Sequence, residues 1–103
     1  MILYDQLYVG KSLQLKKDKI IRKMKKGKVV LRLFCVTLPL GSNGILELYS
    51  YTELLQPWLK DRNPIVVGIA GSRIEAFSLI EHLVHCMYQQ TGEFSVSKYL
   101  GIE

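Results

Sequence analysis

The sequence predicts a small α/β domain, with an α+β arrangement as the alternative, in which a mixed sheet of three to four strands packs with about three helices. Segments with strand-like apolar runs alternate along the chain with segments of helical periodicity. Hydrophobic residues make up 49% of the chain and charged residues 22%, which excludes a disordered chain. A length of 103 residues favours a single domain over residues 1–103.

The N-terminal third predicts an uncertain extended segment followed by a basic helix. Residues 2–9 are short and mixed in character, and suit either a strand or an extended arm. A helix is expected over 12–26, because Ser12 is a suitable N-cap and Gly27 a suitable end. Its predicted apolar face consists of Leu13, Ile20, Ile21 and Met24.

The middle of the chain predicts a hairpin and a second helix. Residues 29–38 are rich in β-branched and aromatic residues, so an interior strand is expected there. Residues 39–44 carry Pro, Asn and two Gly, and residues 45–51 resume an extended pattern, which together favour a hairpin. A helix is expected over 52–61, kinked or shortened by Pro57.

The C-terminal third predicts the centre of the sheet and the longest helix. Residues 65–70 are apolar on both faces, as in a strand that is covered on both sides. Ser72 and Glu75 match the Ser-x-x-Glu capping box, so a helix is expected over 72–90. Residues 94–97 suit a short edge strand.

Positive charge is concentrated in one segment. Ten basic residues lie between Lys11 and Arg32, against the single acid Asp18, which gives this segment a balance of +9. The whole chain carries +5, so the remainder is slightly acidic at −4. We therefore expect an electrically lopsided molecule.

The basic helix is the strongest functional feature of the sequence. Cations at helical spacing suit contact with successive phosphates, and lysines outnumber arginines, which favours diffuse attraction over base reading. The sequence thus predicts a non-catalytic binding or adaptor module, with nucleic acid as the first expected partner and an acidic protein or a membrane surface after it. The alternative is a solvated face without a partner. The expected polyanion-binding residues are Lys16, Lys19, Arg22, Lys23 and Lys26.

Weaker signals indicate possible sites for an anion and for stacking of nucleobases. Gly68, Gly71 and Ser72 lie at a predicted strand-to-helix turn, where free amides could bind an anion, although an ordinary turn has the same residues. The loop 41–44 could form a similar anion nest or a plain hairpin turn. Tyr49 and Tyr51 share a face of the strand 45–51 and could stack bases, or could simply pack.

The segment from Gly10 to Ser12 resembles the end of a phosphate-binding Walker loop. That loop requires a glycine where this chain has Asp5, so we do not expect nucleotide hydrolysis. No Gly-x-Ser-x-Gly elbow is present either. The activity class is uncertain on these grounds, with a non-enzyme favoured and no cofactor expected.

Two further functions remain open. His82, His85 and Cys86 lie within about one helical turn and are weak metal-ligand candidates, which would need further ligands from Cys35, Glu53 or Glu81. An anion- or metal-binding enzyme around residues 68–72 and these histidines is therefore the first alternative. The second is a self-associating structural protein, such as a homodimer, because the helix 72–90 has a broad apolar arc.

The sequence also indicates a cytoplasmic location. Its first residues do not form a secretory leader, and no apolar run is long enough to insert into a membrane. The two cysteines lie far apart inside apolar runs, so free buried thiols are expected rather than a disulfide.

Overall fold

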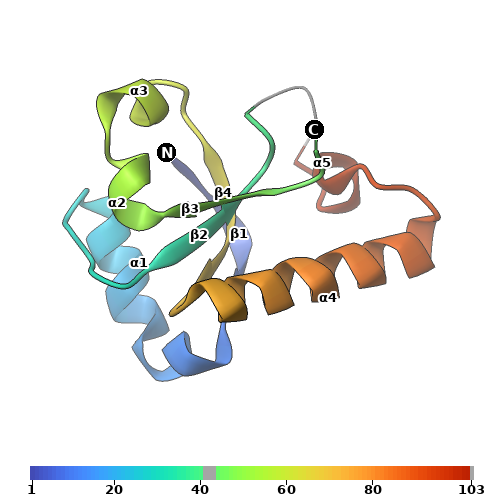
Figure 1. Ribbon diagram of the computed structural model, residues 1–103, viewed down its shortest axis with the longest axis horizontal. Coiled ribbons are helices and arrows are strands. Elements are labelled where there is room, and N and C mark those ends of the chain that lie inside the picture. The colour runs from blue at the N-terminus through green and yellow to red at the C-terminus, as the bar shows by residue number, and fades with distance from the viewer. Residues whose placement is uncertain (41–43, 103) are drawn as a thin grey trace.

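The protein contains a four-stranded mixed sheet with the strand order β1-β4-β2-β3 (Figure 1). The computed structural model describes residues 1–40 and 44–102. β1 runs parallel to β4, whereas β2 runs antiparallel to both β4 and β3. The sheet and the helices around it confirm the predicted mixed α/β fold. The strands are β1 (Ile2–Val9), β2 (Phe34–Thr37), β3 (Glu47–Ser50) and β4 (Ile65–Ala70).

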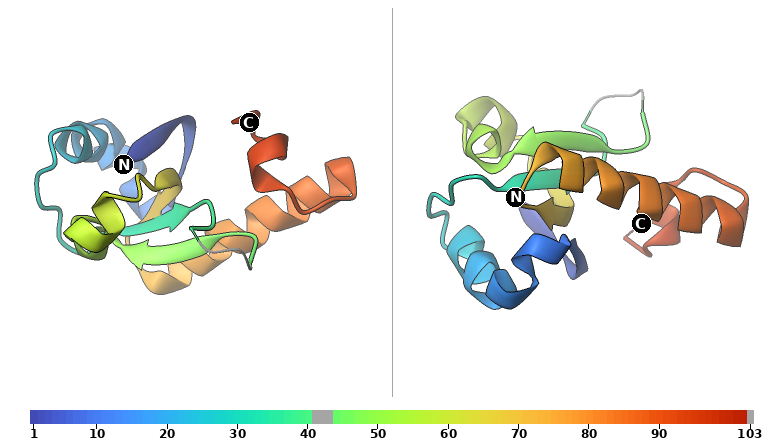
Figure 2. Two further views of the ribbon diagram at one scale, coloured as in Figure 1. Left: turned by 90° about the horizontal axis from the view of Figure 1, so that it is seen from above. Right: turned by 60° about the horizontal axis from the view of Figure 1, so that its bottom comes forward.

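Helices cover both faces of the sheet, with α1 on one side and α4 on the other (Figure 2). The helical elements are a 3-10 helix η1 (Lys11–Lys16), α1 (Lys17–Lys25), α2 (Tyr51–Leu54), α3 (Pro57–Lys60), α4 (Arg73–Thr91) and α5 (Val96–Tyr99). Within the described residues, no helix combines the length and the apolar character needed to cross a membrane.

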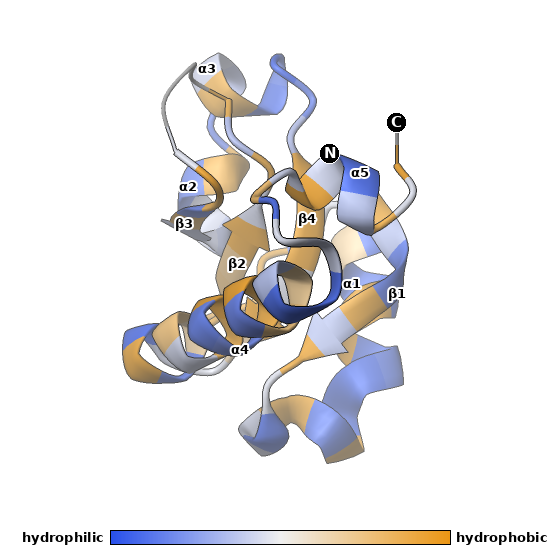
Figure 3. Ribbon diagram, turned by 90° about the vertical axis from the view of Figure 1, so that its right-hand side faces the viewer, coloured by the Kyte–Doolittle hydropathy of each residue, from blue (hydrophilic) through white to orange (hydrophobic). Residues whose placement is uncertain are grey.

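β4 occupies an inner position, as its uniformly apolar sequence predicts. Val66 and Ile69 belong to the core beneath α1, which also contains residues of α2 and α3. Val67 and Ala70 belong to the second core, beneath α4 and α5. All four side chains are fully buried, and Figure 3 shows β2 and β4 as largely hydrophobic strands. Both faces of β4 are apolar because a layer of helices covers each of them.

The predicted helix over 12–26 is divided in two. Its first part is the 3-10 helix η1, and regular α-helix begins only at Lys17. Ser12 is not the N-cap, because its hydroxyl donates to Glu75 Oε1 at 2.7 Å and its backbone N–H donates to Oε2 at 3.1 Å. A side chain 63 residues away thus replaces the local cap.

The predicted end of this helix at Gly27 is confirmed. Gly27 has a φ of +68°, and its N–H donates to the Met24 carbonyl at 3.0 Å. The Lys28 N–H donates to the Lys23 carbonyl at 3.0 Å, which completes a Schellman motif. The chain leaves α1 at this point.

The predicted strand over 29–38 is much shorter in the structure, because β2 includes only Phe34–Thr37. Val29 and Leu31 are 62% and 76% exposed, and Arg32 has a φ of +55° that a regular strand does not allow. The chain after the Schellman turn is thus a loop over residues 28–33. Val30 packs against the edge of the core, and Leu33, which is 2% exposed, is the first fully buried residue after the turn.

The predicted hairpin is confirmed, but the following elements differ. β2 and β3 pair antiparallel, and β3 ends at Ser50. Ser50 forms a complete capping box with Glu53 and so begins α2 at Tyr51. Pro57 is the first residue of α3, a position that needs no amide hydrogen. The expected helix over 52–61 is therefore two short helices.

The predicted edge strand over 94–97 is wrong. Val96 begins the short helix α5 and is 3% exposed in the core beneath α4. The hydroxyl of Tyr4 in β1 donates to the Leu100 carbonyl at 3.2 Å and holds the end of this helix against the sheet. Packing of Val96 therefore overrides the local strand preference of the segment.

Candidate functional site

A groove of about 470 Å³ lies between the η1–α1 segment and the loop 28–33. The Schellman turn after α1 leads into this loop, so α1 and the loop form its two walls. Lys16, Lys19 and Lys23 line one wall and Arg32 lines the other. The apolar part of the lining consists of Leu13, Ile20, Val30, Leu31 and Leu33. We call this feature the basic groove.

The basic groove is strongly cationic. Four of its lining residues are basic and none is acidic. In the part of the chain that the structure describes, the only ion pair joins Lys98 to Glu93 at 3.7 Å. No carboxylate of the described residues is thus ion-paired with a cation of the groove, so an anionic ligand would meet these cations directly.

The packing of α1 decides which lysines face the groove. Ile20 and Met24 are 7% and 5% exposed and anchor the helix on the sheet. Lysines on one flank of these residues line the basic groove. Lys17 and Lys25, on the other flank, line a separate hollow together with Asp5. Opposite flanks of one short helix thus differ in their electrostatic surroundings.

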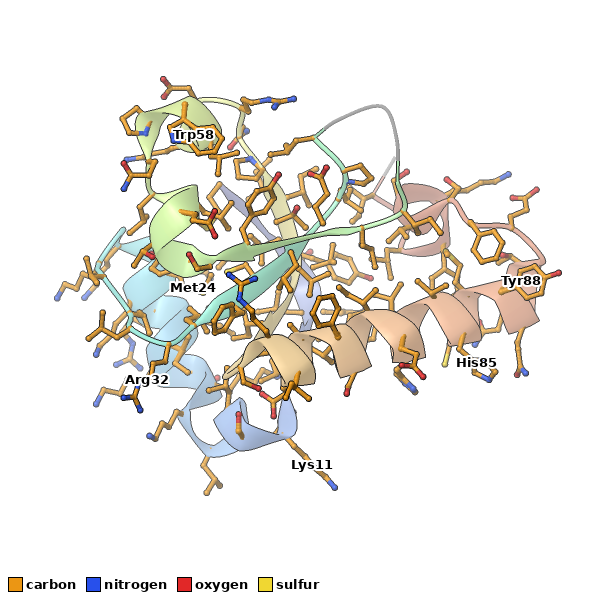
Figure 4. All side chains as sticks on the ribbon, in the orientation of Figure 1. Lys11, Met24, Arg32, Trp58, His85 and Tyr88 are labelled. Carbon is orange, nitrogen blue, oxygen red and sulfur yellow. The ribbon has the colours of Figure 1, made fainter. Side chains whose placement is uncertain are left out.

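Three of the five residues predicted to bind a polyanion come together in the basic groove. Arg22 and Lys26 are exposed and do not line it, and Lys26 is the C-cap of α1. Arg32 lines the groove although the sequence places it within a strand. Figure 4 shows Arg32 beside the η1–α1 segment, on the far side of the molecule from His85 and Tyr88. The only sequence signal that Arg32 would line the groove is that it belongs to the basic segment 11–32.

A hydrogen-bonded cluster around Glu75 fixes the end of the groove formed by Ser12 and Gly71. The Glu75 carboxylate accepts the Gly71 N–H at 2.8 Å in addition to the two hydrogen bonds from Ser12. Desolvation by burial raises the pKa of Glu75, but the hydrogen bonds from Gly71 and Ser12 outweigh it and lower the pKa overall. The carboxylate therefore stays charged and joins η1 to α4.

This cluster also accounts for the predicted anion-binding turn. The Gly71 amide is engaged by Glu75, and Gly68 lies within β4 rather than at the turn. Ser72 is the N-cap of α4 and accepts the Glu75 N–H at 3.1 Å, whereas the Glu75 side chain takes the Gly71 and Ser12 donors. A Cβ on Gly10 would clash with the Glu75 carboxylate, so a side chain there would displace this carboxylate from the cluster. The protein's own carboxylate thus occupies the anion position of this turn.

The two tyrosines that could stack bases are separated. Tyr49 lies in β3 and its hydroxyl donates to Glu47 at 3.1 Å, whereas Tyr51 is fully buried in α2. They do not share a face of one strand, since the strand ends at Ser50. The predicted nest at 41–44 lies outside the described residues at positions 41–43.

The candidate metal ligands lie along α4. Cys86 Sγ and His82 Nε2 are 3.7 Å apart, and His85 lines a shallow hollow with Ser78, Glu81 and His82. Over residues 1–40 and 44–102, no three His, Cys, Asp or Glu side chains gather as a metal site would require. Cys35 and Cys86 are both free, and burial raises the pKa of Cys35 to about 12.

The fold and the basic groove together define a small α/β protein with a cation-lined concave surface that has no acidic lining residue. No protein-family model, curated protein or solved structure matches the chain. A function is therefore inferred from the residues of the groove.

Proposed function

We propose that this protein is a non-catalytic binding module that holds a single-stranded nucleic acid by its phosphate backbone in the basic groove. The observation that supports this most strongly is the convergence of three lysines and one arginine, from two separate segments, on a groove without acidic lining. Such a surface attracts regularly spaced phosphates and releases their counterions.

The spacing of the lysines suits a linear polyanion. Lys16, Lys19 and Lys23 are separated by three and four residues, so about 5 Å of helix axis separates neighbouring charges. A phosphodiester backbone carries one charge on every repeat. An acidic protein surface carries carboxylates at irregular intervals, and therefore matches this row less well.

The concave shape favours a single strand over a duplex. A groove of about 470 Å³ admits one backbone, whereas a duplex presents its phosphates on a convex surface. Leu31 is 76% exposed beside the cations and offers an apolar contact for a base without selecting its sequence. We therefore expect sequence-tolerant binding.

The backbone of Arg32 supports a functional role for this residue. A φ of +55° is uncommon for arginine and costs about 1–2 kcal/mol relative to the ordinary regions. Glycine would adopt this conformation more easily. Strain of this kind is found at binding sites, where it holds a side chain in a required place.

The test is a pair of charge reversals on the same helix, measured by fluorescence anisotropy with a labelled oligothymidine. Lys19→Glu, in the groove, should weaken binding about five- to tenfold. Lys17→Glu, on the opposite flank, makes the same change in net charge and should weaken binding no more than about twofold. Equal losses in the two variants would show that net charge, not the groove, attracts the oligonucleotide.

A second probe separates nucleic acid from acidic protein. Polyglutamate of similar charge should compete with the oligothymidine only weakly. Competition at equal charge concentration would instead favour an acidic protein as the partner.

A further inference from the structure

α4 carries a second apolar stripe, apart from the face that packs on the sheet. Ala76, Leu83 and Met87 are buried against the sheet and α5. At about 100° per residue, a second set is centred roughly 120° around the helix from these. That set lines an open hollow of about 560 Å³ and consists of Phe77, Ile80, Glu81, Val84, His85 and Tyr88, extended by Phe94. We call it the outer stripe.

The outer stripe exposes a contiguous apolar patch of the size that often marks an interaction site. Phe77, Tyr88 and Phe94 are 58%, 53% and 50% exposed, and Ile74 at the start of the helix is 81% exposed. Half-exposed aromatic side chains contribute about 100 Å² each, so these three alone present about 300 Å². With Ile74 and the flanking side chains, the patch is large enough to form the centre of an interface of about 800 Å² per partner.

The aromatic part of the stripe is uncovered and already ordered, whereas Ile80 also packs against the core beneath α4. The C-terminal half of α4 extends beyond the sheet in Figures 1 and 2, with α5 packed on its other side. The rings of Tyr88 and Phe94 are stacked, with centroids 4.9 Å apart and planes within 10°. These side chains would lose little conformational entropy when covered.

We propose that the outer stripe binds the outer stripe of a second copy of this chain, with the two α4 helices antiparallel about a two-fold axis. The order of residues along the stripe is suited to this arrangement. An axis between positions 82 and 83 places Phe77 opposite Tyr88 of the partner subunit. It also places Ile74 close to the partner's stacked pair, so apolar surface meets apolar surface at both ends.

The polar residues of the stripe favour the same orientation, because a carboxylate can accept a hydrogen bond from an imidazole N–H. Glu81 and His85 are the polar members of the stripe, one on each side of its centre. In the antiparallel arrangement Glu81 lies beside His85 of the partner subunit, twice per dimer. A parallel arrangement would place Glu81 against Glu81 of the partner subunit, which is unfavourable.

The position of α4 also keeps the positive charges apart. α1 and α4 lie on opposite faces of the sheet, so a dimer joined through α4 has its two basic grooves on its outer sides (Figure 2). The segment with a balance of +9 is thus distant from the interface. Self-association is therefore independent of the proposed nucleic-acid binding and is tested without a ligand.

The test is sedimentation equilibrium of the full chain over a concentration series. The wild type should show a monomer–dimer equilibrium, and Phe77→Glu should raise the dissociation constant about 30-fold or more. Leu15→Glu changes an equally apolar and fully exposed residue of η1 and should leave the equilibrium unchanged. A wild type that stays monomeric up to millimolar concentration, or a dimer that is insensitive to Phe77→Glu, would overturn the proposal.

A charge exchange and a cross-link test the orientation. Glu81→Arg should weaken the dimer, and adding His85→Glu in the same chain should restore it. In a Cys86→Ser background, a mixture of Glu81→Cys and Val84→Cys chains should form a mixed disulfide on oxidation, since these positions face each other. Gln89→Cys chains, changed on the exposed flank outside the stripe, should not cross-link with themselves. Absence of rescue together with unselective cross-linking would exclude the antiparallel arrangement.

Discussion

Binding of a single-stranded oligonucleotide should depend on salt with a slope that the four cations of the basic groove determine. For single strands, each neutralised phosphate contributes about −0.7 to the slope of log K against log salt, so four contacts give about −2.8. Between about 50 and 200 mM salt, the association constant should therefore fall roughly 50-fold. The assay is fluorescence anisotropy of a labelled oligothymidine over a salt series.

A matched pair of variants tests whether the cations of the groove cause this salt dependence. Lys23→Ala removes one groove cation, so the slope should fall to about −2.1 and the loss over the same salt range to roughly 20-fold. Lys25→Ala removes an equal charge from the opposite flank of α1, where Lys25 lines the hollow with Asp5, and should leave the slope unchanged. Equal slopes for the two variants would refute the assignment of phosphate contacts to the groove.

Three further predictions concern stability and its relation to binding. Arg32→Gly should relieve the positive φ and raise the free energy of unfolding by about 0.5–1 kcal/mol in urea titration, while oligonucleotide binding becomes weaker; reduced stability would contradict the proposed strain. Tyr51→Phe should raise the free energy of unfolding by about 1 kcal/mol, because the buried hydroxyl has no hydrogen-bond partner among the described residues. A marked loss of stability would contradict this and show that the hydroxyl is hydrogen-bonded in the folded protein. Since the folded-state pKa of Glu75 is lowered, its contribution to stability is present above its ordinary pKa of 4.5 and is lost as the pH falls through the folded-state value. The difference in unfolding free energy between wild type and Glu75→Gln should therefore shrink as the pH falls below 4.5, and a difference that is constant with pH would exclude the charged cluster.

The elements with strong local signals were predictable from sequence. Residues 65–70 are apolar on both faces because β4 lies between two helical layers. Gly27 ends α1 because it adopts the positive φ that the Schellman motif requires. Ser72 begins α4 through a hydrogen bond within the first turn. The two helix ends are determined by residues that are close together in the sequence. The strand is recognisable because its whole length is apolar.

The other elements depend on contacts that the local sequence does not contain. The segment 29–33 has strand propensity but forms one wall of the groove, because the turn after α1 and the burial of Leu33 direct its course. The boundary at Ser50 was accessible, since Ser50 and Glu53 form a capping signature, but the apolar run 45–51 obscured it. Ser12 loses its capping role to Glu75, which is distant in sequence.

The candidate site also combines features that local sequence predicts with features that depend on tertiary structure. Helical spacing alone predicts that Lys16, Lys19 and Lys23 lie on one side of the helix, and the structure places them together. Spacing does not tell which flank faces the loop, and Arg22 lies on the helix outside the groove. Lys26 continues the spacing of Lys16, Lys19 and Lys23, but it is the C-cap of α1 and does not line the groove. Arg32 was not included because its place depends on a positive φ within a loop.

The most direct test of the basic groove is an NMR titration of the isotope-labelled protein with unlabelled oligothymidine. Backbone amide shifts should change mainly at the residues that line the groove, namely Ser12, Lys16, Lys19, Lys23, residues 30–33 and Gly71. They should change hardly at all at Lys17 and Lys25 or along the outer stripe of α4. Shifts centred on α4, or spread evenly over all exposed lysines including Lys17 and Lys25, would contradict the assignment of phosphate binding to the groove.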